Sequence, residues 1–164
     1  MKIIGIDPGL SGAIAILENN KVLNIFDIPV MSEGKKNKRQ LNSALLVSLL
    51  KENINKEEEE VAVVVEQVNA MPGQGVTSMF NFGQTFGAIK GICAALEFPI
   101  YFVRPSKWKK HFELINSSKD SSRTKAIEMY PKLSNQLAKK KDVNKSDAIL
   151  IARYFSETRL TKEN

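Results

Sequence analysis

The sequence has few of the residues that build disulfides or zinc sites. Among its 164 residues there is one cysteine, Cys93, and one histidine, His111. A single cysteine excludes an internal disulfide, and one cysteine with one histidine cannot complete a Cys/His zinc cluster. We therefore expect a protein of a reducing compartment, namely the cytoplasm.

Long apolar runs are also missing. No stretch approaches the roughly 20 apolar residues that span a bilayer, and Met1-Lys2 leads directly into a strand pattern rather than a signal peptide. The length suits one ordinary domain with a substantial core. We expect a single soluble domain over residues 1–164, with no membrane partner.

Positive charge is concentrated in one part of the chain. The net charge is +6, and Arg104 to Asp147 carry 12 Lys/Arg against 5 Asp/Glu, a local excess of +7. The remaining residues carry 12 against 13, a balance of −1. A polyanion-binding face requires such an excess. A solvated helical surface would give the same pattern.

The N-terminal residues predict an antiparallel meander. Strand patterns cover Lys2–Ile6, Gly12–Leu17 and Lys21–Pro29. The turn Glu18–Asn20 contains two asparagines, which tolerate positive φ. The polar, basic segment Glu33–Arg39 lacks periodicity and predicts a loop.

The middle of the chain predicts a helix and further strands. Residues Gln40–Asn53 form an amphipathic pattern. Its apolar positions at helical spacing are Leu41, Leu45, Leu49 and Leu50. Val61–Glu66 is an apolar, β-branched run of the kind buried on both faces of a sheet. Ile100–Val103 predicts one more strand.

The segment Ser78–Leu96 predicts a long helix with an unusual glycine spacing. Gly83, Gly87 and Gly91 are four residues apart and share one helical face. Each glycine costs a helix up to about 1 kcal/mol relative to alanine. A close neighbour, either a partner helix or the sheet, would explain them.

The C-terminal third predicts further helices. A short basic helix starts at Pro105, because proline suits a first helical turn, and another covers Ser118–Tyr130. Ser146 is predicted to cap a closing helix with Asp147 in its first turn. The predicted fold class is α/β, with a five-stranded mixed sheet flanked by helices.

Three carboxylates end predicted elements that are far apart in the sequence. Asp7 ends the first strand before a Pro-Gly turn, Glu66 ends the fourth strand, and Asp147 begins the closing helix. In a mixed sheet the first strand is usually central and the fourth runs parallel beside it. We therefore expect Asp7 and Glu66 at one sheet edge, within reach of Asp147.

Such a cluster requires a counter-ion. Oxygen-only ligands select Mg²⁺ or Mn²⁺, and two ions roughly 3.5–4 Å apart can activate water and stabilise the leaving oxygen of a phosphodiester. Each acid also has an ordinary structural interpretation. Asp7 suits a turn, Glu66 a solvated strand end, and Asp147 a helix start favoured by the dipole.

Three segments together carry a family resemblance. Ile4–Gly9, Val65–Val68 and Asp147–Ala152 resemble the signatures of RuvC-type Holliday junction resolvases. The resemblance implies a ribonuclease H-like fold, a homodimer, and Mg²⁺-dependent paired nicking of four-way DNA junctions that leaves 5′-phosphate and 3′-hydroxyl ends.

By motif, Asp7, Glu66 and Asp147 correspond to three acidic metal ligands of the family. A fourth ligand, Asp or His, usually lies three residues before the last acid. Here that position is Asn144, a neutral oxygen donor, and Asp142 is two residues further upstream. Either residue could complete the site.

The segment Pro105–Lys109 resembles the family element that ends in a lysine beside the scissile phosphate, which assigns Lys109 a catalytic role. Lys119 corresponds loosely to a second basic residue facing DNA. Further phosphate contacts are expected from generic basic positions, each also explicable as a solvated residue. These positions are Lys107, Lys110, Arg123 and Lys125.

Family members often carry an aromatic residue after the Glu66 motif, where this sequence has Asn69. Met71 could insert apolar surface into the junction instead, although routine packing explains it equally. Trp108 is expected to anchor its helix to the core, and His111 to be non-catalytic. Ser78–Leu96 resembles the helix through which resolvase protomers pair.

Two other classes of function remain open. A different ribonuclease H-like nuclease, acting on flaps, forks or RNA–DNA hybrids, would share the same acids. A non-enzymatic junction-binding protein would retain the fold. Actin-like sugar kinases also begin with a strand and an Asp turn, but they need two domains, so no nucleotide cofactor is expected.

Overall fold

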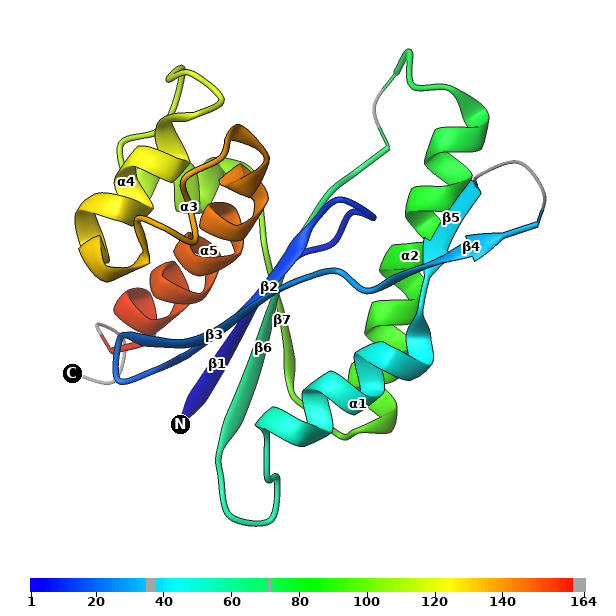
Figure 1. The fold of residues 1–164 in the computed structure, drawn as a ribbon, viewed down its shortest axis with the longest axis horizontal. Helices are drawn as coiled ribbons and strands as arrows, with labels where there is room; N and C mark the ends of the chain where they lie inside the picture. Colours follow the sequence, from blue (N-terminus) through cyan, green and yellow to red (C-terminus); the bar gives the residue numbers. More distant parts are fainter. Residues whose placement is uncertain (35–37, 71, 161–164) are drawn as a thin grey trace.

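The computed structural model describes residues 1–34, 38–70 and 72–160, and a five-stranded sheet in the order β3-β2-β1-β6-β7 forms its centre (Figure 1). The strands are β1 (Lys2–Asp7), β2 (Ala13–Glu18), β3 (Lys21–Asp27), β6 (Val61–Glu66) and β7 (Ile100–Val103). β1 is central, antiparallel to β2 and parallel to β6. The predicted mixed sheet and N-terminal meander are confirmed.

Helices cover both faces of this sheet, as Figure 1 shows. They are α1 (Ser43–Asn53), α2 (Val76–Ala95), α3 (Pro105–His111), α4 (Ser121–Met129) and α5 (Val143–Leu160), with 3₁₀ turns η1 (Pro131–Leu133) and η2 (Lys140–Asp142). Alternating strand residues point to opposite faces, so the core divides into two clusters. One lies under α3, α4 and α5, and the other under α1 and α2.

The loop predicted over Glu33–Arg39 is partly wrong, and so is the predicted start of the following helix. Strands β4 (Val30–Glu33) and β5 (Lys38–Leu41) form an antiparallel pair. The pairing overrides the weak local pattern, because β5 buries Leu41. Helix α1 therefore begins at Ser43 and buries Leu46 and Leu50, while Leu45 remains 46% exposed.

The predicted cap of the closing helix is also wrong. α5 begins at Val143, so Ser146 lies inside the helix and Asp147 lies in its second turn. The Ser146 hydroxyl is buried and donates a hydrogen bond of 3.2 Å to the carbonyl of Asp142. The 3₁₀ turn η2 ends at Asp142 and continues directly into α5. The helix therefore starts before Ser146, and Ser146 is not its N-cap.

Helix α5 packs unusually close to the central strand. A Cβ atom at Gly5 of β1 would lie 2.1 Å from the carbonyl oxygen of Ala148. Ala13 and Ala15 of the neighbouring strand belong to the same buried layer. Small side chains on this face therefore let the α5 backbone rest on the sheet, next to the end of β1.

The glycine face of α2 does not pack on the sheet. Gly83, Gly87 and Gly91 are exposed, and in the described part of the chain nothing lies within 4 Å of a Cβ built on any of them. Of the two explanations for the glycine spacing, packing against the sheet is therefore wrong. Within residues 1–34, 38–70 and 72–160, no helix is long and apolar enough to cross a membrane.

Candidate active site

Asp7 and Glu66 end two adjacent parallel strands. β1 and β6 are in register with Ile6 opposite Val65, so the next residue of each strand is the carboxylate. Asp147 reaches the same place from α5, because Ala148 packs on Gly5 of β1. The three acids approach closely enough for both Glu66 and Asp147 to influence the titration of Asp7.

Burial makes the ionised forms of these acids costly. It raises the pKa of Asp7 to about 7, helped by repulsion from Glu66 and Asp147. Burial likewise raises the pKa of Asp147 to about 6, with Glu66 adding to the effect. The pKa of Glu66 is also raised by burial. Clustered carboxylates with raised pKa values are typical of functional sites, which makes these three acids candidates for one.

Two neighbouring side chains orient the carboxylates, and the sequence reasoning did not find either role. The Trp108 indole Nε1 donates a hydrogen bond of 2.8 Å to Glu66 Oε1. Ser122 of α4 hydrogen-bonds Asp147 and lowers its pKa, partly offsetting burial. Trp108 is fully buried, as expected of an anchor. Neither contact has a sequence signal, because each joins residues from different elements.

Lys109 is the cation that acts on all three acids. Its charge lowers the pKa of Asp7, Glu66 and Asp147. Its Nζ lies 5.3 Å from the centre of the Trp108 ring, within cation–π range. α3 thus presents one residue that orients a carboxylate and one that supplies positive charge.

The two candidates for a fourth ligand occupy different environments. Asn144 lies three residues before Asp147 and donates a hydrogen bond of 2.5 Å to the carbonyl of Ser11, in the loop after β1. Asp142 is buried and binds the backbone N–H of Lys139 and the ammonium of Lys145. Asn144 is therefore tied by a hydrogen bond to the loop that follows Asp7, whereas the Asp142 carboxylate binds groups of its own segment.

The remaining basic candidates differ in how they are engaged. Lys119 lowers the pKa of Asp147, whereas Arg123 holds Asp120 through two hydrogen bonds of 2.7 Å. Lys125 lies 4.0 Å from Glu128. Lys107, Lys110 and Lys119 are exposed, and none of the three has an ion pair within the described residues.

Two other residues from the sequence analysis, His111 and Met71, remain to be placed. His111 contacts Glu157 of α5, with 2.6 Å between Nε2 and Oε2, which gives it a structural partner. Met71 lies outside the described residues, so its expected contact with DNA stays a prediction.

The donor set fits a hard divalent cation. Asp147 Oδ1 is buried and has no hydrogen-bond partner in the described part of the chain. Among the same residues, however, no three His, Cys, Asp or Glu side chains already stand in metal-binding geometry. The fit therefore rests on donor type and on the unpartnered Asp147 oxygen, because carboxylate oxygens are the ligands that Mg²⁺ and Mn²⁺ prefer.

The arrangement of the whole chain has counterparts among solved structures. Thermus thermophilus RuvC in complex with a Holliday junction substrate aligns with a TM-score of 0.62 and 16% identity, over 97% of this chain and 96% of that one. The fold is that of RuvC-type resolvases. The fold class predicted from the sequence, ribonuclease H-like, is therefore confirmed.

Two further structures give the same result. Another Thermus thermophilus RuvC structure aligns with a TM-score of 0.54 and 18% identity, over 97% of both chains. The fowlpox virus Holliday junction resolvase aligns with a TM-score of 0.51 and 16% identity, over 97% of this chain and 99% of that one. A scan of family models and a search of curated proteins gave no match.

Proposed function

We propose that this chain is a metal-dependent, structure-selective DNA endonuclease that resolves four-way junctions by paired nicking. The convergence of Asp7, Glu66 and Asp147 beside Lys109 carries the proposal. These residues come from three elements that only the fold brings together. The RuvC-like fold, shared with a structure that holds a Holliday junction substrate, supports the same conclusion.

Asp7, Glu66 and Asp147 would hold one or two Mg²⁺ ions, for which Mn²⁺ would substitute, with the amide oxygen of Asn144 as a further donor. Such ions activate water and stabilise the leaving oxygen in phosphodiester hydrolysis. Trp108 fixes one oxygen of Glu66, and Asn144 holds the loop after β1 through Ser11. The surrounding side chains thereby limit how far the ligands can move.

Lys109 has a separate task at the phosphate. A lysine ammonium stabilises negative charge that develops on a scissile phosphate, and Lys109 is close enough to influence all three acids. Lys107, Lys110 and Lys119 would contact phosphates further along the DNA. Arg123 is the weakest candidate for DNA contact, because its guanidinium already binds Asp120 and the carbonyl of Leu137.

Paired nicking needs two active sites, and the exposed face of α2 offers a surface for pairing. Val76 is 81% exposed and Phe80 is 65% exposed, and the open glycine positions continue this face along the helix. Small residues allow two helix backbones to approach closely. We propose a homodimer through α2. A strict monomer at micromolar concentration in sedimentation velocity, with and without junction DNA, would count heavily against it.

The decisive test is cleavage of a synthetic mobile four-way junction in the presence of Mg²⁺, with each strand labelled in turn. We expect symmetric nicks in two strands of like polarity. Forks, flaps and RNA–DNA hybrids serve as competing substrates. Preferred cleavage of one of these would identify a different ribonuclease H-like nuclease, and binding without any cleavage would indicate a non-enzymatic junction-binding protein.

A further inference from the structure

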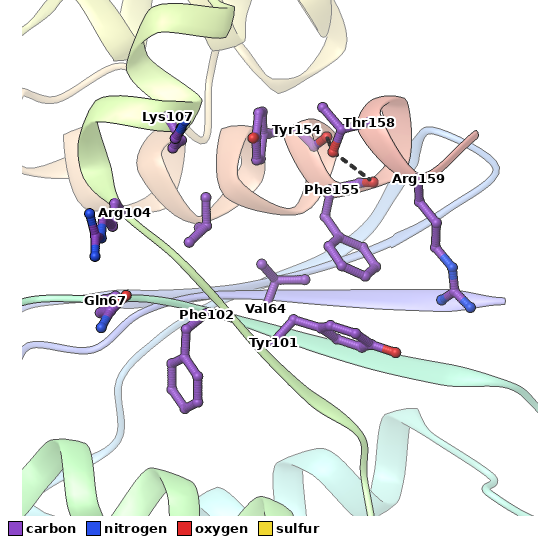
Figure 2. A pocket seen from close by; sticks show the side chains of 11 residues that line it. Val64, Gln67, Tyr101, Phe102, Arg104, Lys107, Tyr154, Phe155, Thr158 and Arg159 are labelled. Carbon is purple, nitrogen blue, oxygen red and sulfur yellow. Dashed lines mark hydrogen bonds between the residues drawn. The ribbon is translucent and has the colours of Figure 1, made fainter. Parts of the chain in front are cut away.

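Strand β7 has an open edge beside a groove. It is the last strand of the central sheet, and no strand in the described part of the chain pairs with its outer side. A groove of about 670 Å³ runs along it toward α5. Figure 2 shows Arg104 and Gln67 at one end of this groove and Tyr101 and Arg159 toward the other.

The backbone of β7 presents hydrogen-bonding groups to this open side. The carbonyls of Pro99 and Val103 accept hydrogen bonds from Val63 and Gln67, so odd-numbered positions of β7 face β6. Because backbone groups alternate in direction along a strand, the N–H and C=O groups of Phe102 point away from the sheet. An extended chain could pair with them.

Within its four residues, the outer edge carries no side chain that blocks pairing. Ile100–Val103 contains no charge, no proline and no register shift, whereas exposed edges are commonly blocked by one of these. Tyr101 is 39% exposed and Phe102 is 44% exposed. Tyr101 packs on Phe155 of α5 at 4.7 Å, and Phe102 packs on Phe86 of α2 at 5.8 Å. The rings therefore lie on opposite faces of the sheet.

An added strand would place alternate side chains on these two aromatic surfaces. The charge around the edge selects the partner. Arg104, Arg159 and Lys107, which is also a proposed phosphate contact, line the groove, and no Asp or Glu of the described residues lines it. Lys90 adds a fourth positive charge, with its Nζ 5.6 Å from the centre of the Phe102 ring. A partner that alternates acidic and apolar residues would complement both features.

These observations also disfavour two copies of this chain pairing through β7. Antiparallel pairing of two identical edges would bring the cations of one copy against those of the other, and like charges across an interface oppose association. We propose that the β7 edge is a docking site for an extended acidic segment of a partner protein, which adds to the sheet as a sixth strand. None of Asp7, Glu66 and Asp147 lines the groove, and strand addition does not require nuclease activity.

A matched pair of variants tests strand addition. Phe102→Pro removes the outward N–H, and proline is tolerated where that group faces solvent. Phe102→Thr removes the same ring but keeps the N–H. The probe is a fluorescent octapeptide that alternates glutamate and valine, followed by anisotropy. We expect Phe102→Pro to weaken binding about tenfold relative to Phe102→Thr, the effect of losing one backbone hydrogen bond.

Charge selection has its own test. Arg104→Gln should weaken binding of the glutamate peptide, and a lysine–valine peptide should not bind the wild-type protein. Circular dichroism and thermal unfolding check that every variant folds.

Four results would overturn the proposal. The glutamate peptide could fail to bind, or it could bind Phe102→Pro and Phe102→Thr equally. A labelled thymidine decamer could bind instead and depend on Arg104 but not on the Phe102 N–H, which would make the groove a site for single-stranded nucleic acid. Finally, self-association abolished by Phe102→Pro would show that a second copy occupies the edge.

Discussion

At the level of single residues, the clustered carboxylates of the candidate site lower the stability of the folded chain when no metal is bound. Asp7 has its pKa raised to about 7 by burial and by two neighbouring carboxylates, against the single opposing charge of Lys109. At neutral pH the chain therefore holds charges that repel one another. Strain of this kind is common where function requires an arrangement that stability alone would not select.

Replacing Asp7 tests this directly. Asp7→Asn should abolish Mg²⁺-dependent cleavage while leaving junction binding intact, because a ligand is lost and the basic face is not. Without metal, the variant should be more stable by roughly 1–3 kcal/mol at pH 8, since a buried charge with a raised pKa is removed. Gel-based cleavage, gel-shift binding and thermal unfolding provide the measurements. Retained cleavage would contradict the site assignment.

Trp108 offers a second test, because it touches a carboxylate without being a ligand. Trp108→Phe removes the hydrogen bond to Glu66 Oε1, which should raise the pKa of that carboxylate further. We expect cleavage at limiting Mg²⁺ to fall roughly 10–100-fold, the usual effect of losing a group that orients a ligand. A Mg²⁺ titration should recover part of the activity. An unchanged Mg²⁺ dependence would show that the indole only fills space.

At the level of elements, one contact between a helix and a strand assembles the site. α5 rests on β1 at Gly5, where a methyl group would meet the carbonyl of Ala148 at 2.1 Å. Asp147 precedes Ala148, and Asp7 is two residues beyond Gly5. The absence of a side chain at Gly5 therefore controls the separation of two proposed ligands.

Gly5→Ala should consequently damage both folding and chemistry. The added methyl group overpacks the core, which typically costs about 1–3 kcal/mol, and moves Asp147 away from Asp7. Gly87→Ala is the matched control for protomer stability only, because nothing in the described part of the chain lies within 4 Å of its Cβ, although it lies on the proposed pairing face of α2. The control should raise protomer stability by up to about 1 kcal/mol. Chemical denaturation of both variants and the cleavage rate of Gly5→Ala are the measurements, and full activity in Gly5→Ala would contradict the proposed role of Gly5.

At the level of the whole molecule, protonation of Asp7 and Asp147 links the free energy of unfolding to metal binding. The folded pKa values of Asp7 and Asp147 are about 7 and about 6, above their ordinary value of 3.8. Between these limits the folded chain binds more protons than the unfolded chain. The contribution of these groups to the free energy of unfolding therefore falls as pH rises from about 4 to about 7.

A divalent cation should reverse that loss, because it binds the ionised carboxylates of the folded chain. We expect Mg²⁺ to raise the melting temperature clearly at pH 8 and little at pH 5. Cleavage should decline below about pH 7 and recover with more Mg²⁺, since protons and metal compete for the same oxygens. Asp7→Asn is the control, with a smaller Mg²⁺ effect. An equal shift at both pH values would contradict carboxylate-held metal.

The sequence predicted the strands and helices well where the residue pattern matches the burial that the element has in the fold. Val61–Glu66 and Ile100–Val103 match the observed strands, because apolar β-branched or aromatic runs suit the inside of a sheet. It failed at Lys38–Leu41, where a basic, irregular stretch forms a strand only because β4 lies beside it. Pairing with a neighbour leaves no periodic signal in a four-residue segment.

The sequence by itself determined the acids, their order and the strands that carry Asp7 and Glu66, because strand patterns and a family resemblance depend on residue type and spacing. Tertiary structure alone decided which groups surround those acids. The indole of Trp108, the hydroxyl of Ser122 and the close packing at Gly5 join residues far apart in the chain. Such contacts follow from how elements pack in space, which local sequence does not encode.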